Sequence, residues 1–252
     1  MARTPLGTAL TQAHRGQQQA LRASVVRDVM KLWPAWQPSR PDSYQAFERA
    51  MVLLVQSRSG QSAAIAARYY EMYRAIESPA KTLRTVPIAQ PKSVEEIRAA
   101  IGATTRGAVY KSLAAGKPFE TVMRNSLVEV SGTVSRDALA GGRETIYAEQ
   151  VRDPRAMGVA RITGAAPCAF CAMLASRGDV YLSEESAGQI DGQMMEWHTN
   201  CDCGIEVAYE GYEMNARSLA QREQWKASDG TLNGFRRDLN KTPEAPFRFE
   251  RP

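Results

Sequence analysis

The feature of this sequence that most constrains its fold is the placement of its cysteines. All four (Cys168, Cys171, Cys201 and Cys203) lie in one short window, and His198, one of only two histidines, lies there too. A C-x-x-C pair followed by H-x-x-C-x-C is typical of zinc sites, because each arm presents two ligands to a tetrahedral ion. We therefore predict a structural zinc ion. Since a tetrahedral site takes four ligands, one of the five residues is not a ligand.

Other interpretations of the cluster stay open. Cys168 and Cys171 could form a thiol–disulfide site, but such a site favours a βαβ context that the helical N-terminal half does not offer. Thiols without a metal, or disulfides formed after release from the cell, are a third interpretation. A catalytic zinc is disfavoured, because it needs an open coordination position and a nearby general base.

Length and charge limit the class of protein. The 252 residues are enough for one large domain or two small ones. No apolar run is long enough for a membrane span, and the N-terminus lacks the apolar core of a signal peptide, so we expect no membrane association and a reducing cytoplasm. Residues 1–155 carry 22 Lys and Arg against 13 Asp and Glu, and residues 156–252 carry 10 against 14. The basic half could contact nucleic acid, although solvated Arg-rich helix faces are the simpler interpretation.

Hydrophobic periodicity predicts an N-terminal half made of long helices. We expect a break of the second helix at Gly60 and a kink or break of the last one at Gly141-Gly142. Ser93 and Glu96 form a capping box that opens the third helix. The predicted helices cover residues 8–32, 43–77, 93–116 and 118–150.

After Arg155 the pattern changes. Short strands are predicted at residues 159–162 and 204–209. Helices follow at 215–227 and 232–239. The fold class is therefore α+β and predominantly α. We expect an elongated helical domain over residues 1–155, a small zinc-stapled α/β module over 156–240, and a proline-containing tail over 241–252.

No catalytic constellation stands out. The sequence has no H-E-x-x-H, G-x-S-x-G or Walker-type phosphate-binding motif. With His198 assigned to the metal, only His14 is left for a nucleophile–base pair, and its polar surroundings predict a solvated side chain. We assign no catalytic residue, and an enzymatic role is less favoured than a structural one.

Four strings carry a resemblance to a known family. They are G-x-x-P-C-A-F-C-A-M-L-A-S-R-G-x-V-Y at 164–181, W-H-T-N-C-D-C at 197–203, A-A-R-Y-Y-E-M-Y-R at 66–74 and N-G-F-R-R at 233–237. Together they resemble Mu F-like minor head proteins of tailed bacteriophages, in the version found in actinobacterial phages. The resemblance covers roughly residues 45–240 and is strongest over 159–205.

The resemblance implies a minor capsid protein present in multiple copies inside the virion, at the portal vertex. Its implied partners are the portal protein and the major capsid protein. Contact with packaged DNA, without sequence specificity, is also implied. Assembly would take place in the host cytoplasm. Such proteins are often labelled capsid maturation proteases, which is the alternative function. A zinc-dependent nucleic-acid binder is a weaker alternative. The family's Cys/His motif falls on Cys168, Cys171, His198, Cys201 and Cys203.

Overall fold

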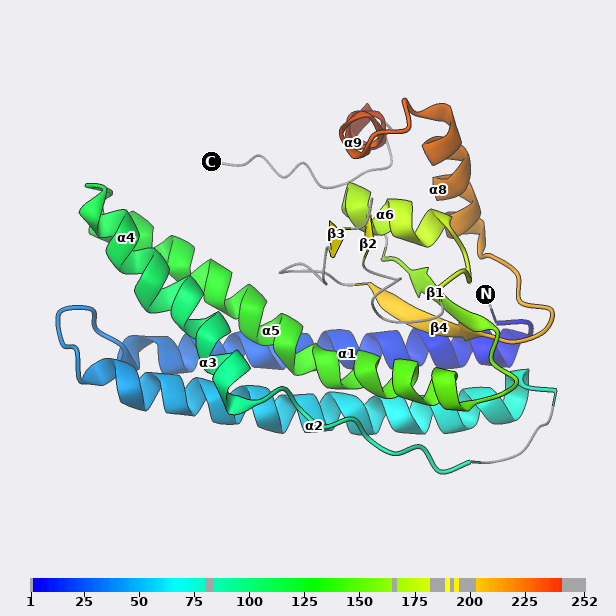
Figure 1. The fold of residues 1–252 in the computed structure, drawn as a ribbon, viewed down its shortest axis with the longest axis horizontal. Helices are drawn as coiled ribbons and strands as arrows, with labels where there is room; N and C mark the ends of the chain where they lie inside the picture. Colours follow the sequence, from blue (N-terminus) through cyan, green and yellow to red (C-terminus); the bar gives the residue numbers. More distant parts are fainter. Residues whose placement is uncertain are drawn as a thin grey trace.

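The protein is built on three long helices that lie side by side (Figure 1). The computed structural model describes residues 2–79, 84–164, 167–181, 189–190, 193–194 and 203–241. The long helices are α1 (Pro5–Leu32), α2 (Ser43–Glu77) and α5 (Phe119–Arg152). At about 1.5 Å per residue, the longest extends for roughly 50 Å. Most of the residues so described are helical, which confirms the predominantly α fold. None of the helices described here is long and apolar enough to cross a bilayer.

Local signals set where these helices begin. The Thr4 side chain accepts a hydrogen bond from the Gly7 N–H and so caps α1. The predicted capping box is confirmed: Ser93 and Glu96 bond reciprocally at the start of α3 (Val94–Gly102). The predicted long helices are each confirmed to within a few residues at their ends.

The glycines within the long helices do not break them, so the predicted break at Gly60 is wrong, and α5 is not broken at Gly141-Gly142. Gly60 lies inside the continuous α2, and Gly141-Gly142 inside the continuous α5. A Cβ atom on Gly141 would lie 2.5 Å from the Ser59 carbonyl oxygen. The Gly142 N–H donates to Ser62 Oγ at 3.1 Å. The pair therefore allows the backbones of α5 and α2 to approach closely.

A shorter helical segment covers one end of the bundle. The predicted helix over 93–116 consists of α3, a π-helical turn η2 (Ala103–Gly107) and α4 (Ala108–Ala114). Gly116 ends it with a φ of 76°. Its apolar face joins a core with α1, α2 and α5 that includes Val25, Val29, Phe47, Met51, Ile97, Ile101, Val122, Val130 and Val134.

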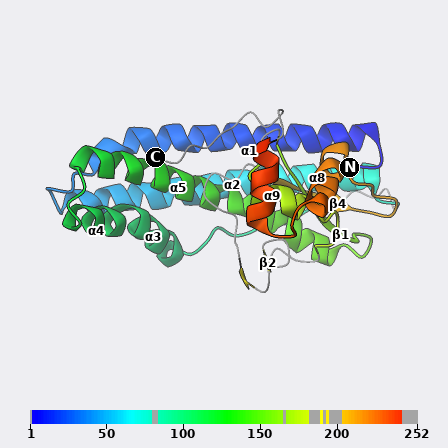
Figure 2. The same cartoon turned by 90° about the horizontal axis from the view of Figure 1, so that it is seen from above.

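The C-terminal part lies over the other end of the bundle, near the N-terminus (Figures 1 and 2). Two antiparallel strands form its base, and Arg161 pairs with Ile205 in their register. They confirm the two predicted strands. The elements are β1 (Gly158–Ile162), α6 (Ala169–Ser176), β2 (Gln189–Ile190), β3 (Gln193–Met194), β4 (Gly204–Ala208), α8 (Ala216–Ala227) and α9 (Leu232–Lys241).

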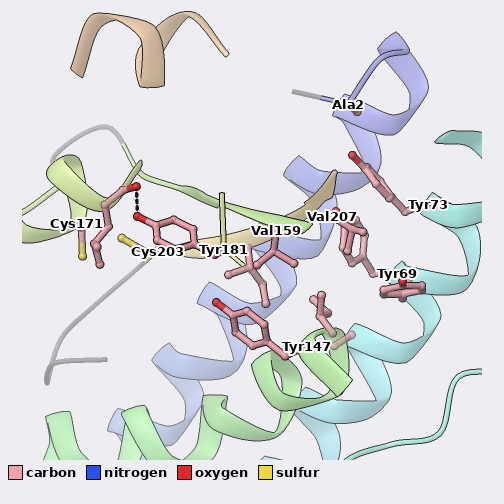
Figure 3. Packing of buried hydrophobic residues seen from close by; sticks show 14 of the residues in the cluster. Ala2, Tyr69, Tyr73, Tyr147, Val159, Cys171, Tyr181, Cys203 and Val207 are labelled. Atoms are coloured by element: carbon pink, nitrogen blue, oxygen red, sulfur yellow. Dashed lines mark hydrogen bonds between the residues drawn. The ribbon is translucent and has the colours of Figure 1, made fainter. Parts of the chain in front are cut away.

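One apolar core joins this module to the bundle. Tyrosines of α2 and α5 pack with both strands and with α6, as Figure 3 shows for Tyr69, Tyr73, Tyr147, Val159 and Val207. The strands are thus buried on both faces. The module is not held on by a linker alone but shares its hydrophobic core with the helices.

A buried ion pair adds to this junction. Arg74 of α2 donates to Asp153, which follows α5, at 2.8 Å, and Tyr209 after β4 donates to the same carboxylate at 3.0 Å. Both charged side chains are almost fully buried. Burial alone would raise the pKa of Asp153, but hydrogen bonds from Arg74, the Arg155 backbone N–H and Tyr209 outweigh it and lower that pKa. The carboxylate is therefore held in its ionised form.

Candidate functional site

The C-x-x-C pair forms the start of helix α6. Cys168 is the N-cap residue, and its Sγ accepts a hydrogen bond from the Cys171 N–H at 3.3 Å. The Cys168 side chain is exposed, whereas Cys171 is buried one turn further along. A helix N-terminus favours a thiolate, because its free N–H groups and dipole carry partial positive charge. This end of α6 is therefore suited to presenting sulfur ligands.

The second cysteine arm reaches the same place through the sheet. Cys203 directly precedes β4 and is buried, and the pairing of Gly204 with Ile162 fixes its position. Figure 3 shows Cys171 and Cys203 at the same end of the module core, beside Tyr181. Cys203 thus lies close to Cys168 and Cys171 although it follows them in the sequence by more than 30 residues. No disulfide bond links these three cysteines to one another.

The remaining predicted ligands, His198 and Cys201, lie outside the described residues. Among the residues that are described, no group of three or more His, Cys, Asp or Glu side chains is already arranged to hold a metal ion. The structure therefore brings three of the five candidates together and leaves the other two, and the ion itself, as predictions.

Sequence reasoning missed a buried cation beside this cluster. Arg161 of β1 is 1% exposed, and its guanidinium lies over the ring of Phe170 in α6 at 6.0 Å. The guanidinium is thus packed against the helix that carries Cys168 and Cys171. The signal in the sequence was a single Arg within an otherwise apolar strand, V-A-R-I, which by itself does not show on which face of a sheet the side chain lies.

The opposite face of the sheet carries a buried acid that was also missed. Glu206 of β4 is 1% exposed and accepts a hydrogen bond from Thr11 of α1 at 2.6 Å. Thr11 in turn shares a hydrogen bond with the Tyr69 hydroxyl at 2.9 Å. This network ties β4 to two helices of the bundle and has a structural role.

His14 was predicted to be solvated, and this is wrong. It is 7% exposed, stacks on Tyr69 and contacts the Gln18 amide at 3.2 Å. Burial lowers its pKa to about 4, so the imidazole is neutral at neutral pH. His14 and Cys203 line one small cavity of about 40 Å³ between α1, α5 and β4. His14 therefore contacts an aromatic ring and a side-chain amide.

Helices α8 and α9 brace the cysteine-bearing helix. Gln221 donates to Thr163 at 3.0 Å, and Arg222 donates to the Ser176 carbonyl at 2.9 Å, so α8 holds both the end of β1 and the end of α6. Phe235 of α9 is fully buried and packs edge-on against Trp225. The module thus has packing of its own around the cysteines.

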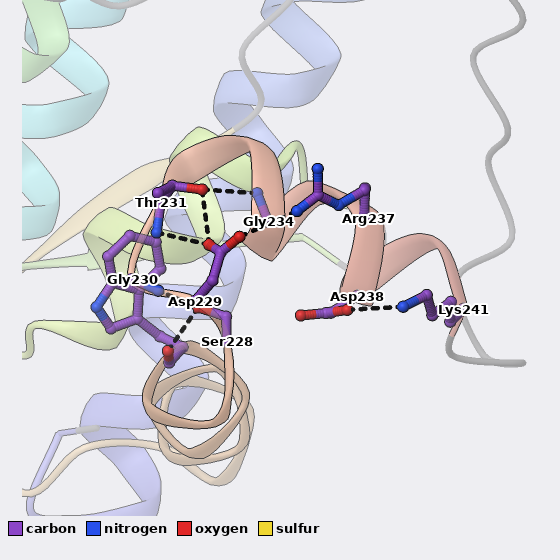
Figure 4. A network of polar contacts seen from close by, with 9 residues as sticks. Ser228, Asp229, Gly230, Thr231, Gly234, Arg237, Asp238 and Lys241 are labelled. Carbon is purple, nitrogen blue, oxygen red and sulfur yellow. Dashed lines mark hydrogen bonds and ion pairs between the residues drawn. The ribbon is translucent and has the colours of Figure 1, made fainter.

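The N-G-F-R-R string forms the first turns of α9 (Figure 4). Thr231 accepts a hydrogen bond from the Gly234 N–H at 3.0 Å, and a Cβ atom on Gly234 would collide with the Asp229 carboxylate. Arg237 pairs with Asp229 at 3.0 Å, and the hydrogen bond from Thr231 lowers the pKa of Asp229. The glycine and the phenylalanine therefore have structural roles, whereas the second arginine forms an exposed ion pair.

Comparison with known proteins places this chain in one family. The model of the VG15 protein family matches residues 7–227, which include most of the bundle and of the module. The chain therefore belongs to the VG15 protein family. No curated protein and no solved structure matches it.

Proposed function

We propose that this protein is a structural minor head protein of a tailed phage, and that a zinc ion staples its C-terminal module. The observation that carries the proposal is the convergence of Cys168, Cys171 and Cys203 within the stretch that most resembles Mu F-like minor head proteins. His198 and Cys201 supply the further ligand or ligands. The proposed location is the head interior at the portal vertex.

The donor set fits a structural zinc ion. One pair of thiols lies at a helix N-terminus and the third directly precedes a strand, which are the two arms that the ligand spacing predicts. The ion supplies a cross-link whose binding free energy becomes folding free energy of the module. Phe170, Leu174 and Tyr181 belong to the same apolar core as Cys171 and Cys203.

The long helices supply the docking surface in this proposal. A bundle of roughly 50 Å is long enough to lie along a partner subunit. Portal or capsid subunits are the proposed partners, and several copies of the chain are present per virion. The module, which shares its core with the bundle, fixes one end of that surface.

Co-expression with the portal and major capsid proteins of the same genome tests the proposal. We expect the protein to co-sediment with procapsids that contain the portal protein. It should be absent from particles that assemble without the portal protein. Recovery only from the unassembled fraction, with or without portal, would contradict a head role. An Arg237→Met variant, which changes one exposed ion pair, serves as the control that keeps incorporation.

The same particles test the protease alternative. A structural role predicts that the major capsid protein has the same intact mass with and without this chain. Specific cleavage that disappears on substitution of one serine or of His14 would instead assign the protease function. The nucleic-acid alternative predicts that duplex binding is lost when zinc is removed by a chelator.

A further inference from the structure

Helix α3 and the start of α2 lie at the end of the bundle away from the C-terminal module (Figure 1), and a second candidate site lies between them. It is an open hollow of about 340 Å³. Two neighbouring turns of α2 form one wall, and α3 and the π-helical turn η2 form the other. Its lining residues are Tyr44, Gln45, Glu48, Arg49, Arg98 and Arg106. Three arginines from three different elements therefore face one space, which we call the arginine hollow.

The π-helical turn explains how Arg106 comes to face the hollow. Thr105 within η2 is buried, donates to the Ile101 carbonyl and shares a hydrogen bond with the Tyr44 hydroxyl at 3.0 Å. The next residue, Arg106, then lies over the Tyr44 ring at 4.9 Å. A wider helical turn changes the direction of the side chains that follow it, and such turns are frequent at functional sites. The contact with Tyr44 fixes the guanidinium without neutralising it.

The charge of the hollow is positive. The one carboxylate that lines it belongs to Glu48. Its Oε2 lies 3.6 Å from Arg98 Nε and offsets the positive charge of that arginine. Arg49 and Arg106 form no ion pair with any residue that the structure describes. Apart from these four charged lining residues, residues 22–58 and 92–137 carry 10 Lys and Arg against seven Asp and Glu, so the surrounding half of the bundle is also basic. An anion entering the hollow therefore meets two uncompensated guanidinium groups.

We propose that the arginine hollow binds the phosphate backbone of duplex nucleic acid. The planar fork of an arginine side chain matches the oxygens of a phosphate group. The hollow offers no surface for stacking a base, because the only aromatic ring in it, Tyr44, is 4% exposed and already covered by Arg106. The contact is therefore with backbone phosphates and is independent of sequence. It does not rest on the head-protein proposal, since any duplex serves as ligand.

Salt dependence of duplex binding tests this directly with the full-length protein. The probe is a fluorescent DNA duplex of about 20 base pairs, titrated at several salt concentrations, since each phosphate contact contributes about 0.9 to the slope of log Kd against log salt. We expect the triple variant Arg49→Gln/Arg98→Gln/Arg106→Gln to lower that slope by about two to three. The matched control, Arg27→Gln/Arg68→Gln/Arg155→Gln, removes the same charge from exposed positions outside the hollow and should leave the slope within about one of wild type.

A variant that strengthens binding should change the salt dependence in the opposite direction. Glu48→Gln releases Arg98 from its carboxylate, so we expect tighter duplex binding and a slope steeper by about one. Glu129→Gln removes one exposed carboxylate that does not line the hollow, and it should change the slope by much less. These paired variants separate the hollow from the general effect of net charge.

Three results would overturn the proposal. Equal loss of slope in the two arginine triples would show that only net charge matters. Displacement of the duplex by inorganic phosphate, beyond that by chloride at the same ionic strength, would assign the hollow to free phosphate. Stronger binding to vesicles of anionic phospholipid than to the duplex would assign it to a membrane surface. Folding of each variant is checked by its helical circular dichroism.

Discussion

The imidazole of His14 lies parallel to the phenol ring of Tyr69, with the ring centroids 4.3 Å apart and the planes 7° from parallel. Burial lowers the pKa of His14 to about 4 from an ordinary value of 6.5. Between these two values the unfolded chain binds a proton that the folded chain does not. The contribution of His14 to stability is therefore complete above pH 6.5 and is lost as the pH falls toward 4.

This predicts an acid-sensitive stability that one substitution removes. Between pH 7 and pH 5, the free energy of unfolding of the wild type should fall by about 2 kcal/mol more than that of His14→Gln, because each pH unit in this window costs about 1.4 kcal/mol. Urea unfolding at both pH values measures the difference. Parallel falls in the two proteins would show that His14 is protonated in the folded state.

The close approach at Gly141 predicts opposite outcomes for two glycine substitutions. Gly141→Ala places a methyl group 2.5 Å from a backbone oxygen of α2, so the two helices must move apart. We expect a loss of about 2 kcal/mol, since overpacking typically costs 1–3 kcal/mol. Gly60→Ala meets nothing within 4 Å and should stabilise the protein by about 0.5–1 kcal/mol. Thermal unfolding distinguishes the two, and a stable Gly141→Ala protein would rule out the close packing.

The buried ion pair of Arg74 and Asp153 should matter far more than the exposed pair of Arg237 and Asp229. Arg74→Met leaves a buried carboxylate without its cation, which typically costs 3–5 kcal/mol. Arg237→Met removes a pair whose side chains are both exposed, and we expect a change within about 0.5 kcal/mol. Similar losses in denaturant unfolding would mean that Asp153 is solvated or neutral in the native protein.

The helices and the two strands could be predicted from sequence because their signals are local. Apolar periodicity, the Ser93 capping box and Pro118 act within a few residues, so neighbouring residues decide the outcome. The approach of Cys203 to Cys168 and Cys171 is different, because it is a long-range contact that only the zinc-like spacing of the two cysteine arms indicated.

What could not be predicted depends on residues far away in the chain. Gly141 resembles a helix breaker until Ser59 of α2 is placed against it. His14 stands in a polar stretch, and its burial follows from packing against Tyr69. Arg161 and Arg106 likewise acquire their roles from an aromatic ring on another segment. A single sequence does not show such tertiary contacts.

In the proposed function, the convergent cysteines hold a structural zinc ion. Elemental analysis of the untagged protein, purified under reducing conditions with zinc supplied, tests it most directly. We predict about one zinc per chain in the wild type and in the Gly60→Ala control, and none in Cys168→Ser/Cys171→Ser. Cys203→Ser should also lose the metal or bind it much more weakly. A wild-type protein that is folded but contains no zinc, or a double variant that retains it, would contradict the account.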